Sequence, residues 1–150
     1  MLTRGTLLAE KPLKTSYDEA ASDFEAHASQ SPWNAYADRP TMLSLLPDVD
    51  GRDVLDAGCG TGLYCGELLE RGSRLWAFDP SAGMVELAKA KHGDRARFAV
   101  HALESMSDHY EAESFDVVLS ALVLDHVEDL EVAYAQIDRV LRPGGHFVCS

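Results

Sequence analysis

The amino-acid sequence predicts an α/β domain with a doubly wound parallel sheet and helices on both faces. Short apolar segments typical of strands alternate with helical patterns along residues 51–150. One of these segments, Phe115–Ser120, is apolar almost throughout, as expected for a strand covered by helices on both sides. A glycine-rich turn, Gly58-Cys59-Gly60-Thr61-Gly62, joins the first strand to the next helix. Right-handed crossovers between such units give a doubly wound sheet.

Residues 1–50 precede the predicted sheet and are expected to form an N-terminal helical lid. The polar start Thr15-Ser16 and the acids that follow it predict a helix that runs to about Ala28, where Ser31-Pro32 ends it. A second helix is predicted from Pro40, with an apolar stripe that continues until Pro47. The chain therefore divides into a lid, 1–50, and an α/β core, 51–150.

The core is expected to contain five strands in the present sequence. Capping and C-terminal glycine signals bound the intervening helices. Strands are predicted over Arg52–Ala57, Arg74–Phe78, Arg97–Val100, Phe115–Ser120 and His146–Ser150, helices over Leu63–Glu70, Ser81–Lys91 and Glu128–Leu141, and a sharp turn at Pro143-Gly144-Gly145.

Composition and charge narrow the class of protein. With 150 residues and 46% hydrophobic content, the chain is long enough for one domain with its own core. No apolar run approaches the roughly 20 residues of a membrane-spanning helix, and Met1–Leu13 has no secretion signal, so we expect a cytoplasmic protein. The net charge of -12 disfavours nucleic acids and anionic membranes as partners. A small-molecule substrate is expected.

Cysteine and histidine spacing gives no disulfide framework and no metal site. The three cysteines lack C-x-x-C spacing, and the six histidines form no paired ligand pattern. Cys59 lies in the glycine turn before a helix, where a reactive thiol of lowered pKa is one interpretation and a small residue filling a tight turn is the other. We expect no metal and no nucleophilic cysteine.

The glycine turn and a later acid together predict a site for an adenosine-type ligand. Alternating glycines permit a tight turn that exposes backbone N–H groups, so that a polar or anionic ligand group can lie at the start of the next helix. Asp79 ends the second strand, seventeen positions after Gly62. An acid placed in this way accepts hydrogen bonds from both hydroxyls of a ribose.

The loop itself favours S-adenosylmethionine over a dinucleotide. The dinucleotide pattern needs glycine or alanine at the position that Leu63 occupies. Asp56, at the strand end facing the ligand, would repel a phosphate but suits an ammonium or sulfonium group. S-adenosylmethionine carries both of these cations and a ribose.

The segment Val54-Leu55-Asp56-Ala57-Gly58-Cys59-Gly60-Thr61-Gly62 resembles the first motif of the class I S-adenosylmethionine-dependent methyltransferases, in the type 11 branch. Phe78–Met84 is similar to the second motif, and Phe115–Val127 to the fourth strand and the loop that follows it. The resemblance covers roughly Ser16–Ser150. It implies a Rossmann-like sheet of order 3-2-1-4-5-7-6, of which this chain contains 3-2-1-4-5.

The resemblance also implies the cofactor-binding residues. They are Tyr17, Asp56, Ala57, Gly58, Cys59, Gly60, Asp79, Pro80, Met84, Ala102, Leu103 and Ala121. Tyr17 corresponds to a lid residue that reaches the cofactor carboxylate, and Arg39 to a further feature of the preface. One departure concerns adenine recognition: many relatives have an acid after the third strand where this chain has His101, and Glu104 is a candidate substitute.

The implied reaction is displacement at the sulfonium methyl group by a nucleophile of the acceptor. A general base is optional; His126 is the first candidate, with Asp125 and His27 behind it. Two alternatives remain: an NAD- or nucleotide-binding enzyme, and a noncatalytic cofactor-binding interaction domain, because fold does not dictate function.

The last predicted strand, His146–Ser150, would lie at an open edge of the sheet. An apolar edge of this kind invites pairing with another chain. We therefore expect a homodimer through the fifth-strand edge, or a longer chain whose continuation supplies two more strands.

Overall fold

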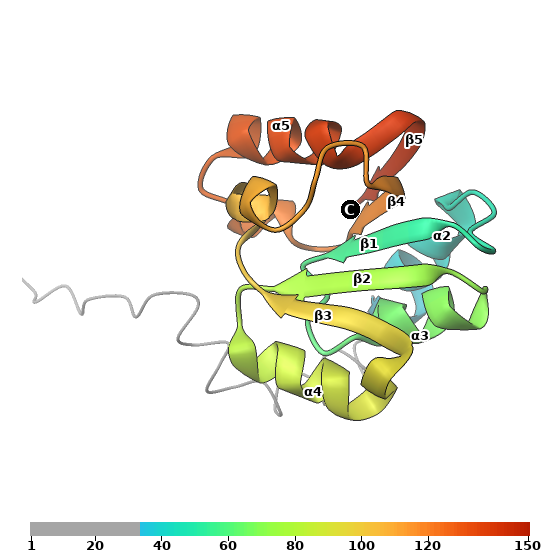
Figure 1. Cartoon of the computed structure of the whole chain (residues 1–150). Coiled ribbons are helices and arrows are strands. Elements are labelled where there is room, and N and C mark those ends of the chain that lie inside the picture. The colour runs from blue at the N-terminus through green and yellow to red at the C-terminus, as the bar shows by residue number, and fades with distance from the viewer. Residues whose placement is uncertain (1–33) are drawn as a thin grey trace, which may run out of the picture.

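The computed structural model describes residues 34–150, and their helices and strands alternate after a short helical start (Figure 1). The predicted helix over 15–28, with Tyr17 and His27, lies outside the described residues. The main elements are α2 (Arg39–Leu45), β1 (Asp53–Ala57), α3 (Leu63–Glu70), β2 (Arg74–Asp79), α4 (Ala82–His92), β3 (Ala96–Val100), β4 (Phe115–Ser120), α5 (Leu130–Val140) and β5 (Leu141–Cys149). Shorter turns are η1 (Asn34–Asp38), a π-helix, and the 3₁₀ segments η2 (Gly93–Arg95), η3 (Leu103–Asp108) and η4 (Leu124–His126).

The five strands form one parallel sheet of order β3-β2-β1-β4-β5. This confirms the predicted doubly wound, Rossmann-like sheet. The order reverses between β1 and β4, since β2 and β3 lie on one side of β1 while β4 and β5 lie on the other. Ligands of open α/β sheets bind at the carboxyl ends of the strands at such a reversal.

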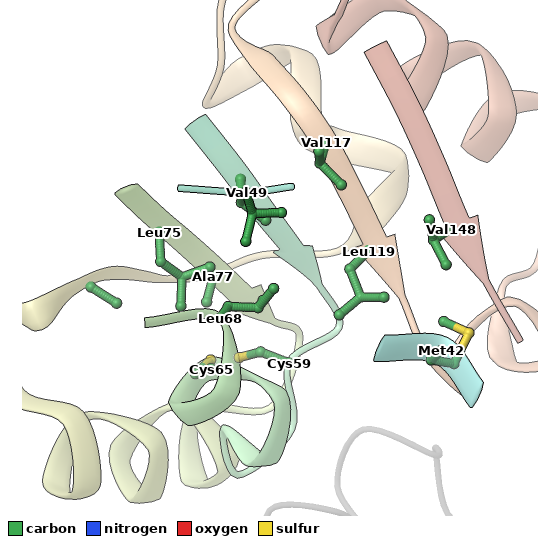
Figure 2. Packing of buried hydrophobic residues seen from close by; sticks show 12 residues of the cluster. Met42, Val49, Cys59, Cys65, Leu68, Leu75, Ala77, Val117, Leu119 and Val148 are labelled. Atoms are coloured by element: carbon green, nitrogen blue, oxygen red, sulfur yellow. The ribbon is translucent and has the colours of Figure 1, made fainter. Parts of the chain in front are cut away.

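Alternating side chains of the strands divide the core into two apolar layers. On one face, Val54 and Leu119 pack with α2 and α3; Figure 2 shows side chains of this cluster, among them Met42, Leu68 and Cys65. On the other face, Leu55 and its neighbours pack against η3 and α5. Figure 1 shows α3 and α4 on the side of the sheet opposite to α5. Both faces are thus covered, which explains why β4 is apolar on both sides.

Side-chain caps set the starts of α4 and α5. The Ser81 hydroxyl accepts a hydrogen bond from Met84 N at 3.2 Å, as its sequence position predicts. The predicted start of α5 at Glu128 is wrong by two residues, because the Asp129 carboxylate accepts from Val132 N at 3.1 Å and makes Asp129 the N-cap.

The segment Pro143–Gly145 is part of β5, where the sequence predicted a sharp turn before the strand. The pairing of β5 with β4 is irregular here: Leu141 pairs with Phe115 and His146 with Val117, so four residues of β5 lie opposite one of β4. Gly144 has φ 77°, which favours glycine. The two glycines therefore form a bulge that lets the chain pass from α5 directly into the strand.

An ion-pair network ties the amino ends of the strands together, opposite the end where ligands bind. Asp53 Oδ1 accepts from Arg74 Nε at 2.6 Å, and its Oδ2 accepts from an Arg142 guanidinium nitrogen at 2.9 Å. Arg142 also binds Asp116 at 2.9 Å, and Asp116 accepts from Asp53 N at 2.9 Å. Four strands, β1, β2, β4 and β5, are joined in this way.

The carboxyl groups of this network have lowered pKa values. The hydrogen bond from Arg74 is the main cause for Asp53, against the opposing effect of burial. Burial raises the pKa of Asp116, but the Asp53 N–H and the Arg142 charge lower it by more. Carboxyls of lowered pKa stabilise the fold above their unfolded pKa, near 3.9, and this stabilisation is lost as the pH falls through the folded values.

In the described part of the chain, no helix is long and apolar enough to cross a membrane.

We predict that Asp53→Asn lowers the free energy of unfolding at pH 7 by about 1 kcal/mol, because the Arg partners of Asp53 are partly exposed and surface ion pairs are weak. Urea unfolding should show the difference from wild type shrinking as the pH falls below about 4, because protonation of Asp53 then removes the same charge from the wild type. Asp94→Asn, at an exposed position, is the control. A difference that stays constant with pH would contradict the network's role.

Candidate functional site

A cavity of about 1070 Å³ lies at the carboxyl ends of the strands. The loops after β1, β2, β3 and β4 form its walls, together with the start of α2. Its lining residues are Asp38, Arg39, Gly58, Cys59, Gly60, Thr61, Leu63, Tyr64, Phe78, Asp79, Pro80, Ser81, Met84, Ala102, Leu103, Glu104, Ala121, Leu122, Val123, Asp125, His126, Val127, Glu128, Asp129 and Val132. This volume suits a small molecule.

Hydrogen bonds within the protein use most of the N–H groups of the glycine turn. Gly58 N and Cys59 N both donate to the carbonyl oxygen of Phe78, each at 2.9 Å, and Gly62 N donates to Cys59 O at 2.9 Å. Gly60 N donates to Asp79 Oδ2 at 2.9 Å. The prediction that the turn presents these N–H groups to a ligand is wrong at these four positions. A pyrophosphate would therefore find few donors here.

Two side chains at the end of α4 form hydrogen bonds with the glycine turn. Lys91 Nζ donates to Thr61 O at 2.8 Å, and His92 Nε2 donates to Gly62 O at 2.8 Å. A carbonyl oxygen only accepts, so His92 carries a hydrogen on Nε2. These contacts fix the positions of the Thr61 and Gly62 carbonyl groups.

Asp79 joins the glycine turn to the loop after β2. Besides its bond from Gly60 N, its Oδ1 accepts from Ser81 N at 2.9 Å. Asp79 is half-buried and lines the cavity. These two bonds hold the carboxylate between the two loops.

Asp56 lies beneath the turn and does not line the cavity. It is 1% exposed, and the Cys65 thiol donates to its Oδ2 at 3.4 Å. Burial raises the pKa of Asp56 to about 7; the thiol hydrogen bond opposes this and the charge of Asp79 adds to it. The prediction that Asp56 faces the ligand is therefore wrong in this structure, because the side chain points to the α3 face. Ala57 is fully buried and does not line the cavity either.

Cys59 lines the cavity, but its environment does not activate a thiolate. The Cys65 hydrogen bond lowers the pKa of Cys59, while burial and the charges of Asp56 and Asp79 outweigh it, so the net pKa is raised. A raised thiol pKa agrees with the interpretation of Cys59 as a small residue in a tight turn. No group of three or more metal-ligating side chains occurs among residues 34–150.

After β3, His101 turns inward while Ala102, Leu103 and Glu104 line the cavity. His101 is 7% exposed and lies between the rings of Phe78 and His109, each 4.0 Å away. Its Nδ1 donates to Ala102 O at 3.0 Å, so in the neutral ring Nε2 accepts from the Tyr110 hydroxyl at 3.1 Å. Burial is the main cause of its lowered pKa, which keeps the ring neutral. His101 therefore supports the cavity wall from behind.

The wall after β4 contains the candidate base. His126 lines the cavity with its side chain 41% exposed, and its Nε2 lies 3.8 Å from Asp125 Oδ1. The chain bends into this wall at Leu122, which has φ 57° and is 45% exposed. A left-handed leucine costs about 1–2 kcal/mol relative to an ordinary conformation, so the rest of the loop must hold it there.

Nine of the predicted cofactor-binding residues line the cavity: Gly58, Cys59, Gly60, Asp79, Pro80, Met84, Ala102, Leu103 and Ala121. Sequence reasoning missed several others as candidate ligands. Tyr64 is one turn into α3, and its hydroxyl donates to Asp38 Oδ2 at 2.8 Å. Thr61 lies within the glycine turn and lines the cavity, but the sequence pattern did not predict it as a ligand-binding residue.

We predict a large difference between alanine substitutions at two glycines of the turn. Both glycines have positive φ, 84° for Gly58 and 52° for Gly60. A Cβ at Gly60 meets open space, so Gly60→Ala should cost about 1 kcal/mol of stability from backbone strain alone. A Cβ at Gly58 overlaps the Val123 side chain, so Gly58→Ala should cost distinctly more. Urea unfolding of the two variants tests this, and equal losses would contradict the close approach of the two loops.

Comparisons with known proteins place this chain among methyltransferases. The family model described as a methyltransferase domain matches residues 55–149. The malonyl-[acyl-carrier protein] O-methyltransferase of Hahella chejuensis is 36% identical over 113 residues, 73% of this chain and 40% of the relative. The ubiquinone biosynthesis O-methyltransferase of Methylocella silvestris is 30% identical over 138 residues, 89% of this chain and 50% of the relative.

A solved structure agrees with these relatives. The S-adenosylmethionine-dependent methyltransferase from Mesorhizobium loti superposes with a TM-score of 0.71 at 32% identity, over 77% of this chain and 54% of that one. The chain spans about half the length of the curated relatives it matches. The matched segment contains the glycine turn, Asp79 and all five strands except the first two residues of β1. The chain therefore belongs to the S-adenosylmethionine-dependent methyltransferase family.

Proposed function

We propose that this chain binds S-adenosylmethionine and transfers its methyl group to a small-molecule acceptor. The observation that carries the proposal is the position of Asp79, which lies at the carboxyl end of β2, lines the cavity and accepts a hydrogen bond from the glycine turn. A carboxylate at this place suits the two hydroxyls of a ribose. The internal use of the N–H groups of the turn favours this ligand over NAD, whose pyrophosphate needs such donors.

The cofactor residues follow from this placement. Asp79 binds the ribose, and the adenine lies against the apolar wall made by Met84, Ala102 and Leu103. Gly58, Cys59 and Gly60 form the floor, and Asp56 and Ala57 support it from beneath. Pro80 and Ala121 complete the described wall. We keep Tyr17 as a proposed ligand of the cofactor carboxylate, and residues 1–50 as a proposed lid over the core 51–150.

The chemistry asks mainly for alignment of the acceptor with the methyl group. Holding two reactants in line supplies roughly 7–11 kcal/mol of the barrier. The wall after β4 faces the same cavity, so an acceptor held there lies beside the donor. His126 is the candidate general base for an acceptor that must lose a proton.

We propose a small molecule as the acceptor. The relatives named above act on different compounds, since one name specifies malonyl-[acyl-carrier protein] and the other ubiquinone biosynthesis. The net charge of -12 disfavours nucleic acid as the acceptor. We also propose the cytoplasmic location that the sequence led us to expect.

We predict that Asp79→Ala raises the Kd for S-adenosylhomocysteine roughly 10- to 100-fold, because hydrogen bonds from the ribose to a charged group are lost. Isothermal titration with wild type and Asp79→Ala measures this. Asp94→Ala is the control, because Asp94 is exposed and does not line the cavity. If the wild type binds NAD tightly and does not bind S-adenosylhomocysteine, the proposal is wrong and a dinucleotide enzyme is favoured. If it binds S-adenosylhomocysteine but transfers no methyl group across an acceptor screen, a noncatalytic domain is favoured.

We also infer a homodimer through the edge of β5, unless a continuation of the chain covers it. β5 is an outer strand of the described sheet, and Tyr134 and Leu130 on the neighbouring helix α5 are exposed. Unpaired strand edges bind other strands. Light scattering should show a dimer that Cys149→Lys returns to a monomer, because an exposed lysine on the edge opposes pairing. A wild-type monomer of 16.4 kDa at all concentrations would contradict the homodimer.

A further inference from the structure

A buried histidine, His101, connects two segments of the cavity wall. Its ring lies between the rings of Phe78 and His109, with a centroid 4.0 Å from each and interplanar angles of 23° and 9°. Its Nδ1 donates to Ala102 O at 3.0 Å. Phe78 in β2 and Ala102 after β3 both line the cavity, whereas His101 does not. The position of this ring therefore determines how the ends of β2 and β3 meet at the cavity.

The hydrogen bonds of His101 require a neutral ring. A carbonyl oxygen only accepts, so Nδ1 carries the hydrogen and Nε2 accepts from the Tyr110 hydroxyl at 3.1 Å. Burial raises the pKa of Tyr110, so this hydroxyl keeps its hydrogen. A proton added to Nε2 would make that nitrogen a donor, and the hydrogen bond from Tyr110 would be lost.

The surroundings of His101 also oppose a positive charge. The groups that face its ring are Phe78 from β2 and two titratable side chains from the end of η3, His109 and Tyr110. Neither ring nitrogen is bonded to a carboxylate. Burial is the main cause of its lowered pKa; the hydrogen bond with Ala102 opposes this and the charge of His109 adds to it. The ring is therefore neutral at pH 7 and takes up a proton only below its ordinary pKa, near 6.5.

We propose that neutral His101 is a positioning residue for the cofactor and that its protonation weakens cofactor binding. A proton on Nε2 breaks the hydrogen bond with Tyr110 and places a cation against the ring of His109, so the stack is disrupted. Phe78 and Ala102 are then no longer held together, and the wall between β2 and β3 loses the shape that binds the ligand. This inference rests on the proposed function and adds a pH dependence to it.

The test measures the Kd for S-adenosylhomocysteine by isothermal titration between pH 8 and pH 5. His101→Phe keeps an aromatic ring in the stack but cannot take up a proton, and His101→Gln keeps a polar side chain without the charge. His146→Gln is the matched control, because His146 is an exposed histidine on β5 that does not line the cavity. Asp56, whose pKa burial raises to about 7, also titrates in this range but is present in every variant. Thermal unfolding at each pH checks that each variant is folded.

We expect the Kd of wild type to rise as the pH falls below about 6.5, by roughly threefold or more beyond any rise in His101→Phe. His101→Gln should behave like His101→Phe, and it keeps the test decisive if His101→Phe does not fold. His146→Gln should follow wild type. His109→Asn should move the rise toward higher pH, because it removes a positive charge and uncovers one face of His101.

A purely structural role of His101 predicts a different result. Its variants would then weaken binding by the same factor at every pH, and this outcome would overturn the inference. A rise that is the same in wild type and in both His101 variants would overturn it as well. A wild type that does not bind S-adenosylhomocysteine at pH 8 would instead overturn the proposed function on which the inference rests.

Discussion

The end of β2 is the constraint on which the cavity depends. The carbonyl oxygen of Phe78 accepts hydrogen bonds from two successive N–H groups of the glycine turn, and the carboxylate of Asp79 accepts a third. The turn is thus bound to the next strand by three contacts that do not involve a ligand. It needs positive φ at its glycines to reach these acceptors, and Gly58 also needs the absence of a side chain against Val123. A preformed turn lowers the ordering cost of binding, since little of it must be fixed when the ligand arrives.

The same hydrogen bonds change how the role of the glycine motif is interpreted. In a phosphate-binding loop the N–H groups are the recognition elements. Here these N–H groups are bonded within the protein, and the proposed function therefore assigns recognition to side chains around the turn, such as that of Asp79. The segment after β3 is similar in this respect. His101 uses both ring nitrogens in hydrogen bonds within the protein, and the residues that follow it line the cavity.

Much of the fold could be predicted from sequence because its signals are local. The bounds of α3 and β4 agree with the predicted ones, since a glycine turn, a C-terminal glycine and a continuous apolar run mark them. The predicted start of α5 was wrong because Asp129, and not the preceding residue, caps the helix. The predicted turn at Pro143–Gly145 was wrong because pairing with β4 makes this segment a bulge within β5. The contacts of the site are nonlocal in the same way. No spacing shows that Tyr64 meets Asp38, 26 positions earlier, or that Asp56 is covered by Cys65.

Asp56 illustrates how such a nonlocal environment decides the chemistry of a residue. From the sequence we expected its carboxylate to face the ligand. In the structure the side chain is buried, and burial raises its pKa to about 7. Ionising a buried carboxyl is unfavourable without a nearby cation, and the Cys65 thiol is only a weak donor. A cationic ligand above the turn would favour the ionised form through the thin layer of the turn, whereas an anion there would oppose it. In the proposed complex, Asp56 would therefore act on the positive charges of S-adenosylmethionine from across the turn and not by direct contact.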